Sequence, residues 1–169
     1  MEIIKCKTDD LEAIQKISRE TFYDTFKDTA SAEDMSLFLD KNYALDKLKK
    51  EFENPNSEFY FLMDRDKVAG YLKLNSDEAQ TENIADNSFE LERIYLDKDY
   101  KFRGLGSVLF DFAESKARDL NKSSIWLGVW EHNKPALSLY TKKGLEVVGS
   151  HPYNIENEPQ TDLIMLKKL

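Results

Sequence analysis

Apolar residues recur at helical spacing in the first part of the chain. Leu11, Ile14, Phe22 and Phe26 fall on one face of a helix, and Thr8 is placed to cap its start. Because three or four residues separate most apolar positions, one face of this helix is predicted to pack on a core.

Two shorter helices are predicted next. The first of them opens at Ser31, where Asp34 three residues on resembles a capping box. The other carries its apolar stripe within residues 45–52 and ends before Pro55, because the residue that precedes a proline disfavours the helical conformation.

From residue 58 on, short strands alternate with helices. A polar turn at residues 64–67 joins two strands as a hairpin, and helices are predicted over 104–120 and 134–143. The predicted strands cover residues 2–6, 58–63, 68–74, 89–96, 124–130, 145–149 and 161–167. This order predicts an α/β (α+β) fold, with one domain over residues 1–169 and a mixed central sheet of six to seven strands flanked by helices.

The composition indicates a folded, acidic protein. The formal net charge of -8 argues against nucleic acid or an anionic membrane as partner. Cys6 is the only cysteine, and His132 and His151 lack metal-ligand neighbours, so we expect no metal and surface roles for both histidines, with His151 in a loop. The N-terminus lacks the apolar run of a signal peptide, so a cytoplasmic location is expected.

Two glycines mark the start of the helix predicted at residue 104. Gly104 and Gly106 carry no side chains, so backbone N–H groups at the helix start can approach an anion closely. The helix dipole adds positive potential, and Lys101 and Arg103 lie beside it, which suits a pyrophosphate. Two glycines that merely ease a tight turn explain the pattern equally well. The dinucleotide-binding fingerprint is excluded, since its third small residue would fall at Leu109.

A second motif decides between these readings. Asn133, Ala136, Tyr140 and Gly144 form the pattern Asn-x-x-Ala-x-x-x-Tyr-x-x-x-Gly downstream of residues 103–106. Together the two segments resemble the acyl-CoA motifs of the GNAT superfamily of N-acetyltransferases, at the spacing that family requires. The resemblance implies an acetyl-CoA-dependent enzyme whose sheet is splayed at the acyl-CoA site.

The resemblance also implies which residues bind acetyl-CoA and which donates a proton. Lys101 stands where the family usually has Gln or Arg, a change we expect to be tolerated because backbone N–H groups hold the phosphates. Tyr140 is expected to act as general acid toward the CoA sulfur, the alternative being a tyrosine that only packs. The expected cofactor-binding residues are Ile94, Tyr95, Leu96, Lys101, Phe102, Arg103, Gly104, Leu105, Gly106, Ser107, Asn133, Tyr140 and Lys142.

Two glutamates are candidates for the proton acceptor. Glu90 and Glu92 lie two residues apart on one predicted strand and therefore share a face. Glu90 occupies the place where histone-type relatives carry their catalytic glutamate, and Glu92 is nearer the expected acetyl group. The alternative for both is a solvated face at a sheet edge.

A closer resemblance covers more of the chain. Residues 21–26, 69–73, 91–95, 126–131 and 160–163 resemble the PaiA-type spermidine/spermine N-acetyltransferases, which implies a polyamine as acceptor. An aromatic wall and carboxylates suit such a cation, although core packing is the alternative for the aromatic side chains. The expected substrate-binding residues are Phe22, Tyr23, Glu90, Glu92 and Trp130.

Other functions stay open at the level of the sequence. A different amine, such as a protein N-terminus, a lysine or a drug amine, is one alternative to a polyamine. A CoA-binding regulatory protein with weak catalysis is another. The partner expected here is a small-molecule amine, and the sequence leaves the oligomeric state open, with a homodimer among the options.

Overall fold

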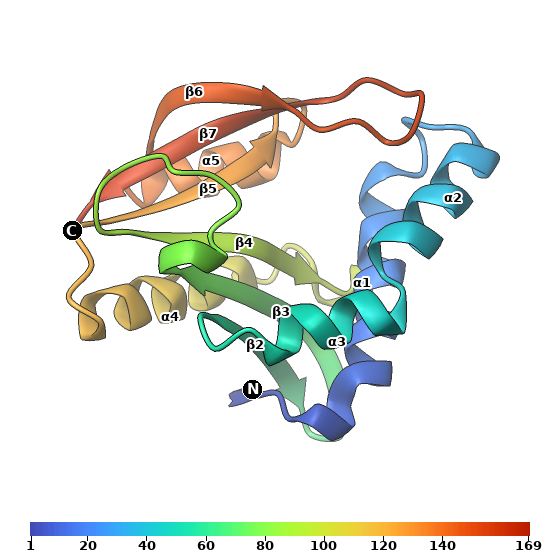
Figure 1. Cartoon of the computed structure of the whole chain (residues 1–169), viewed down its shortest axis with the longest axis horizontal. Helices are drawn as coiled ribbons and strands as arrows, with labels where there is room; N and C mark the ends of the chain where they lie inside the picture. Colours follow the sequence, from blue (N-terminus) through green and yellow to red (C-terminus); the bar gives the residue numbers. More distant parts are fainter.

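The computed structural model describes all residues from 1 to 169, and all its strands form one sheet. The sheet has seven strands in the order β1-β2-β3-β4-β5-β7-β6 (Figure 1). Neighbouring strands are antiparallel except for the parallel pair β4 and β5, so the predicted mixed sheet is confirmed. The strands are β1 (Glu2–Lys5), β2 (Ser57–Asp64), β3 (Lys67–Ser76), β4 (Ser88–Leu96), β5 (Ser124–Trp130), β6 (Glu146–Pro152) and β7 (Thr161–Lys168).

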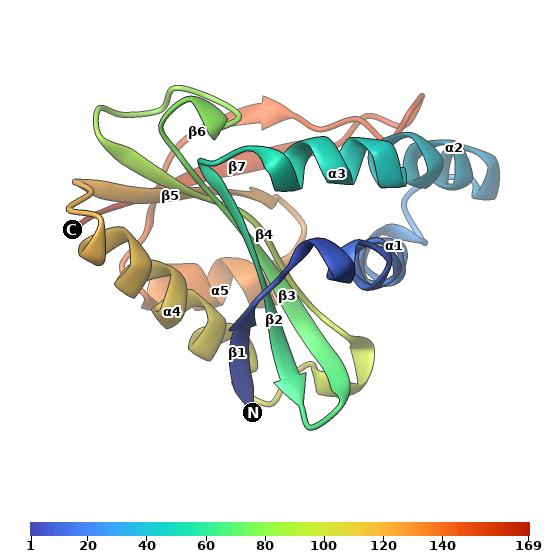
Figure 2. The same cartoon turned by 60° about the horizontal axis from the view of Figure 1, so that its bottom comes forward.

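Five helices cover the two faces of the sheet. Helices α4 and α5 lie against one face, and α1, α2 and α3 cover the other (Figures 1 and 2). None of the helices is long and apolar enough to span a membrane. The helices are α1 (Leu11–Phe26), α2 (Ala32–Asn42), α3 (Leu45–Glu53), α4 (Leu105–Asp119) and α5 (Lys134–Lys142).

Each face of the sheet has its own hydrophobic core. On the α4 face, Leu127 of β5 packs in one cluster with Leu109 of α4. On the α1 face, Phe22 stacks on Phe38 with ring centroids 4.6 Å apart, and Trp130 packs at the border of that cluster. Strand β5 therefore contributes alternate residues to the two cores, as its side-chain period of two requires.

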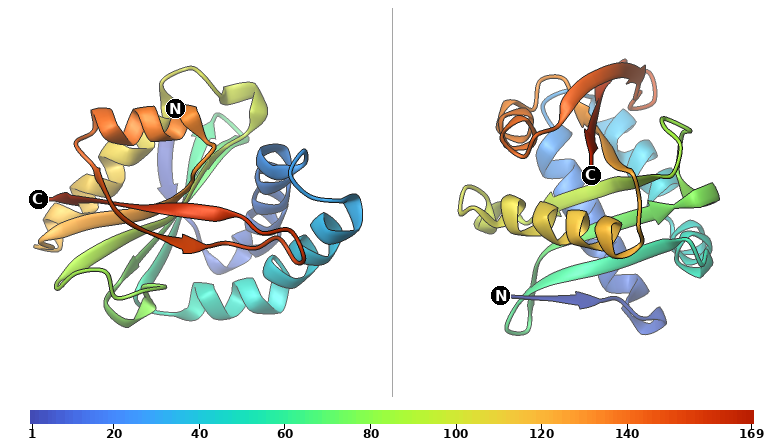
Figure 3. Two further views of the ribbon diagram at one scale, coloured as in Figure 1. Left: turned by 90° about the horizontal axis from the view of Figure 1, so that it is seen from above. Right: turned by 90° about the vertical axis from the view of Figure 1, so that its left-hand side faces the viewer.

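Strands β4 and β5 separate after a short common stretch. They pair only at Ser88–Ser124, Phe89–Ile125 and Glu90–Trp126, as register partners. Beyond these pairs β4 continues to Leu96 and β5 to Trp130 without a ladder between them. Figure 3 shows β5, β7 and β6 diverging from the other strands. The splayed sheet expected from the family resemblance is confirmed, and the backbone groups that line the gap have no partner across it.

Three local predictions have different outcomes. Ser31 does cap its helix, since its hydroxyl accepts a hydrogen bond of 3.0 Å from the amide three residues on. Thr8 does not cap a helix, because it lies in a short 3₁₀ turn and the first α-helical residue is Leu11. The strand predicted at 145–149 runs on to Pro152 because its pairing with β7 continues.

Candidate active site

A single large cleft of about 1270 Å³ opens where β4 and β5 separate. Its lining comes from both faces of the sheet: the start of α4 and the side of α5 on the α4 face, and residues of α1, α3, β3, β6 and β7 on the α1 face. The gap between the strands thus connects the two faces of the sheet.

The start of α4 forms a cradle at one end of the cleft. Gly104 precedes the helix with φ at +76°, a left-handed conformation that glycine adopts without steric cost. A Cβ atom added there would have no other atom within 4 Å, so the space above the helix start is open. Gly104, Leu105, Gly106 and Ser107 all line the cleft, with the unpaired N–H groups of the first helical turn among them. The cradle fits a pyrophosphate group.

In the turn before α4, two of three consecutive side chains border the cleft and the third does not. Lys101 lines the cleft, and its ammonium group is 2.5 Å from the carboxylate of Asp24 on α1. Phe102 also lines the cleft, with a side chain that is 88% exposed. Arg103, by contrast, lies over the ring of Tyr100 and does not border the cleft. Of the expected phosphate-loop residues, the structure brings all but Arg103 to the cleft.

The outer half of β4 forms one wall of the gap. Ile94, Tyr95 and Leu96 line the cleft, as the sequence predicted. These residues pair with β3 on one side, but they have no ladder partner on the side of β5. Their backbone N–H and C=O groups on that side are therefore free to bind an extended ligand with amide groups.

Tyr140 reaches the cleft from α5. The helix is held at its start by Asn133, whose side chain accepts a hydrogen bond of 3.3 Å from the amide of Ala136. Tyr140 is 5% exposed, and its hydroxyl makes no hydrogen bond within the protein. Burial raises the pKa of this phenol, which keeps it protonated at neutral pH. The arrangement leaves an unshared proton donor at the cleft.

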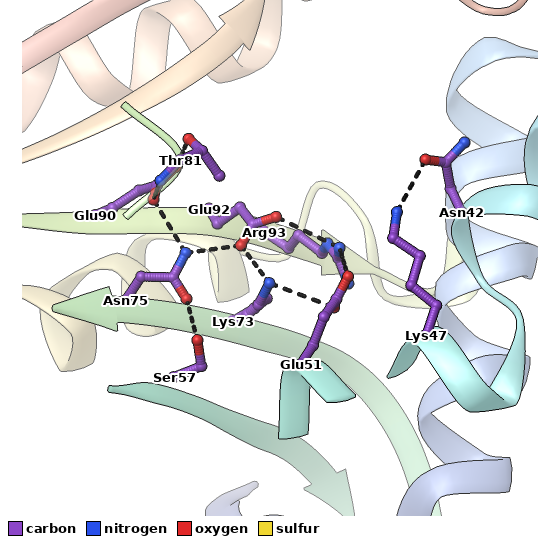
Figure 4. A network of polar contacts seen from close by, with 10 residues as sticks. All are labelled: Asn42, Lys47, Glu51, Ser57, Lys73, Asn75, Thr81, Glu90, Glu92 and Arg93. Atoms are coloured by element: carbon purple, nitrogen blue, oxygen red, sulfur yellow. Dashed lines mark hydrogen bonds and ion pairs between the residues drawn. The ribbon is translucent and has the colours of Figure 1, made fainter. Parts of the chain in front are cut away.

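Glu90 and Glu92 lie side by side on the α1 face of the cleft. The side-chain amide of Asn75 donates hydrogen bonds of 3.0 and 2.7 Å to Glu90 and Glu92 (Figure 4). The shared face predicted for the two glutamates is therefore confirmed. The alternative of a solvated face is wrong, since Glu90 is only 3% exposed.

Glu92 belongs to a buried network of charges (Figure 4). Its carboxylate lies 2.5 Å from the ammonium group of Lys73 and 3.4 Å from the guanidinium group of Arg93. Glu51 of α3 pairs with the same two cations at 3.3 and 3.0 Å. Burial alone would raise the pKa of Glu92, but Arg93 and Lys73 outweigh it and hold that pKa below its usual value.

Glu90 has a different environment. Thr81 donates to its carboxylate through the backbone amide at 2.8 Å and through the hydroxyl at 2.5 Å. Burial, and then the neighbouring charge of Glu92, raise the pKa of Glu90 above its usual value. The loop between β3 and β4 therefore closes over this glutamate.

The aromatic residues expected around the substrate divide into two groups. Trp130 lines the cleft, with its indole N–H donating to Gln160 at 2.8 Å. Phe22 is fully buried in the core of the α1 face and Tyr23 is 51% exposed, and neither borders the cleft. Phe26 lies on the same face of α1 as Phe22 but one turn further along the helix, and there it borders the cleft.

Three residues outside the sequence prediction also meet at the cleft. His151 of β6 contacts the carboxylate of Glu82 through Nδ1 and lies 3.4 Å from Asp162 of β7 through Nε2. The expectation that His151 occupies a surface loop is wrong, because β6 is longer than predicted and pairs His151 directly with Asp162. No group of His, Cys, Asp and Glu side chains in the chain is arranged to hold a metal ion.

Comparison with known families agrees with this geometry. The Acetyltransferase (GNAT) family matches residues 11–145, and the chain belongs to that family. It is therefore an acetyl-CoA-dependent N-acetyltransferase.

Individual relatives cover the whole chain. An uncharacterized N-acetyltransferase encoded in the pepI 3′ region of Lactobacillus delbrueckii subsp. lactis is 47% identical, over 100% of this chain and 98% of that protein. The spermidine N(1)-acetyltransferase of Thermoplasma acidophilum is 26% identical, over 99% of this chain and 97% of that protein. The crystal structure of the PaiA N-acetyltransferase of Thermoplasma acidophilum, in complex with coenzyme A, superposes with a TM-score of 0.79 at 26% identity, over 99% of this chain and 98% of that one.

Proposed function

We propose that this protein transfers the acetyl group of acetyl-CoA to a primary amine of a polyamine such as spermidine or spermine. The observation that carries the proposal is the charge of the α1 face of the cleft. Lys73 and Arg93 are neutralised there by carboxylates of the protein, whereas Glu82, Glu90 and Asp162 make no ion pair with any lysine or arginine. Unpaired carboxylates favour a substrate that carries several positive charges.

The similarity to a spermidine N(1)-acetyltransferase supports the same assignment. An extended polyamine also needs apolar surface along its methylene groups, and Trp126 and Trp130 line the α1 face beside the carboxylates. Phe26, Tyr43 and Tyr153 border the same part of the cleft. These aromatic side chains take the place that the sequence had suggested for Phe22 and Tyr23.

The proposed reaction is a direct attack of the amine on the thioester. The free backbone groups of β4 around Ile94 and Leu96 hold the thioester and the pantetheine arm, and the start of α4 holds the pyrophosphate. Tyr140 gives its proton to the departing sulfur as the carbon–sulfur bond breaks. Glu90, which has no lysine or arginine partner, attracts the ammonium group of the acceptor to the α1 face, and Glu92 lies beside it.

An acceptor series tests the choice of substrate. We expect kcat/KM for spermidine and spermine to exceed that for a primary monoamine of similar length by at least tenfold, because only a polyamine uses the unpaired carboxylates. Steady-state rates of CoA release with each acceptor give the comparison. A monoamine or a peptide N-terminus that matches the polyamines removes the substrate assignment and leaves the acetyltransferase assignment in place.

A further inference from the structure

The acceptor must lose a proton before it can react. An alkylamine with a pKa of about 10 is almost wholly protonated at pH 7, and an ammonium group has no lone pair. The two glutamates expected as bases are both engaged. The carboxylate of Glu92 holds Lys73 and Arg93, and that of Glu90 accepts hydrogen bonds from Thr81 and Asn75.

His151 offers the features that both glutamates lack. Its Nδ1 is in contact with the carboxylate of Glu82, and the tautomer with the ring proton on Nδ1 has its lone pair on Nε2, which lies 3.4 Å from Asp162. A carboxylate in this position orients the imidazole and stabilises the imidazolium ion that forms when Nε2 takes a proton.

The Nε2 edge of the ring lies close to Gly128 of β5, and both residues line the cleft. A Cβ atom on Gly128 would lie 3.4 Å from Nε2 of His151 and 3.3 Å from the carboxylate of Asp162. Because residue 128 is a glycine, both atoms border a space that a side chain would fill. Gly128 is two residues beyond Trp126, the last residue of β5 that pairs with β4, so this space adjoins the gap between the strands.

We propose that His151 is the catalytic base of the reaction, with Glu82 and Asp162 as its positioning residues. Nε2 accepts one proton from the acceptor ammonium group, directly or through one water molecule, and the neutral amine then forms a bond to the thioester carbon. The carbon–sulfur bond breaks, the sulfur takes a proton from Tyr140, and the second proton that leaves the nitrogen restores Tyr140. His151 passes the first proton to solvent. This proposal rests on acetyl transfer to an amine, not on the amine being a polyamine.

The titratable groups that face His151 are two carboxylates. Glu82 faces the ring from the loop before β4, and Asp162 faces it from β7. Strand β5 contributes only Gly128 there, and no lysine or arginine makes an ion pair with any of the three polar residues.

The variant His151→Asn separates a base from a structural residue through two acceptors at pH 7. One is spermidine, which is protonated, and the other is 2,2,2-trifluoroethylamine, which is already neutral. We expect kcat with spermidine to fall roughly 10²–10⁴-fold, as for loss of a general base. With the neutral amine we expect wild type and variant to differ by less than threefold. An equal loss with both acceptors, or no loss with either, overturns the proposal.

The pH dependence with spermidine gives a second readout that does not need the neutral amine. Without a base, log kcat/KM should rise by about one for each pH unit up to the pKa of the amine, near 10. The wild type should level off at a lower pH. If Glu90→Gln shows this behaviour and His151→Asn keeps the wild-type profile, Glu90 is the base and His151 is not.

The space beside Nε2 has its own test. Gly128→Ala places a methyl group against His151 and Asp162, and we expect at least a tenfold loss of kcat/KM for spermidine. Gly149→Ala on β6 is the matched control, since its Cβ atom would meet only Ile164, at an ordinary 3.8 Å. Full activity of Gly128→Ala, or an equal loss in both variants, contradicts a role for that space in amine binding.

Discussion

Burial of Tyr140 keeps its phenol protonated, as a general acid requires. A phenol in an apolar site keeps its proton, and the Tyr140 hydroxyl has no partner in the protein to which it could give that proton. Its ring packs near Phe110, with centroids 6.0 Å apart, which fixes its position in α5 and beside the gap. The hydroxyl is therefore available to a thiolate that forms in the cleft.

The variant Tyr140→Phe keeps the ring and removes only the proton donor. We expect kcat to fall roughly 10²–10⁴-fold, the usual contribution of general acid catalysis, with CoA affinity within about twofold of wild type. Single-turnover kinetics measure the chemical step, and calorimetry measures CoA affinity. Unchanged single-turnover rates in the variant exclude the acid role.

The pair Glu92→Gln and Glu51→Gln separates stability from catalysis within one charge network. Each variant removes one carboxylate from Lys73 and Arg93 while the other remains, so we expect each to lower the free energy of unfolding by roughly 3 kcal/mol, the lower end of the range for a broken buried ion pair. Chemical denaturation measures this. Turnover that falls much further in Glu92→Gln than in Glu51→Gln would assign Glu92 a direct role at the acceptor.

The same comparison has a defined pH dependence. The folded-state pKa of Glu92 is lowered, so its contribution to stability is complete above its unfolded pKa of about 4.3 and is lost as the pH falls through the folded value. The difference in unfolding free energy between wild type and Glu92→Gln should therefore shrink only below about pH 4. A difference that already disappears between pH 7 and 5 contradicts this assignment.

Sequence reasoning reached some of these residues and missed others for a physical reason. Glu90 and Glu92 share a face because the period of a strand is two, which is a local property. The partners of Glu92 that are distant in sequence, Lys73 and Asn75, come from β3, and the partners of His151 come from a loop and β7. Such contacts depend on strand register and helix packing, which no local pattern contains.

At the scale of elements, the residue that precedes α4 has a structural role and a proposed binding role. Gly104 adopts a left-handed conformation that starts the helix and also leaves open the space above its N–H groups. The sequence predicted this element well, because glycine spacing and an apolar stripe are both local. It missed the end of β6, where pairing with β7 extends the strand beyond the predicted boundary.

Two variants at this position separate charge from shape. Aspartate and asparagine both tolerate a left-handed conformation, and neither meets an atom within 4 Å at its Cβ. We expect Gly104→Asp to fold and to lose at least 100-fold in CoA affinity, since its carboxylate faces the pyrophosphate, and Gly104→Asn to lose much less. Calorimetric titration with CoA measures both. Equal affinity of the two variants would place the pyrophosphate elsewhere.

For the molecule as a whole, the splay divides the sheet into β1–β4 and β5–β7–β6. The two parts are joined by only three residue pairs and by the packing of helices on either side. A ligand that fills the gap replaces the missing ladder and contacts both parts. The resemblance to the family predicted that the sheet would be splayed. The three residue pairs that define where β4 and β5 separate are known only from the structure.

Ligand-dependent melting temperatures test this bridging role. At 100 times its dissociation constant, CoA should stabilise the protein by about 2.7 kcal/mol, which for a chain of this length corresponds to a rise of about 5–10 °C. Pantetheine occupies the gap but has no pyrophosphate, so we expect a much smaller rise at the same concentration. Differential scanning fluorimetry measures both, and equal shifts for the two ligands would contradict a dominant phosphate cradle.

A gap that passes through the sheet also has a consequence for the order in which the two substrates bind. The glycine cradle lies on the α4 face and the carboxylates lie on the α1 face, so the proposed sites of the two substrates are on opposite sides of the sheet. We therefore expect both substrates to bind at the same time and acetyl transfer to take place in that complex. Initial rates measured at several fixed concentrations of one substrate should then give double-reciprocal lines that intersect, as for a ternary complex, and not the parallel lines of an enzyme that carries the acetyl group itself.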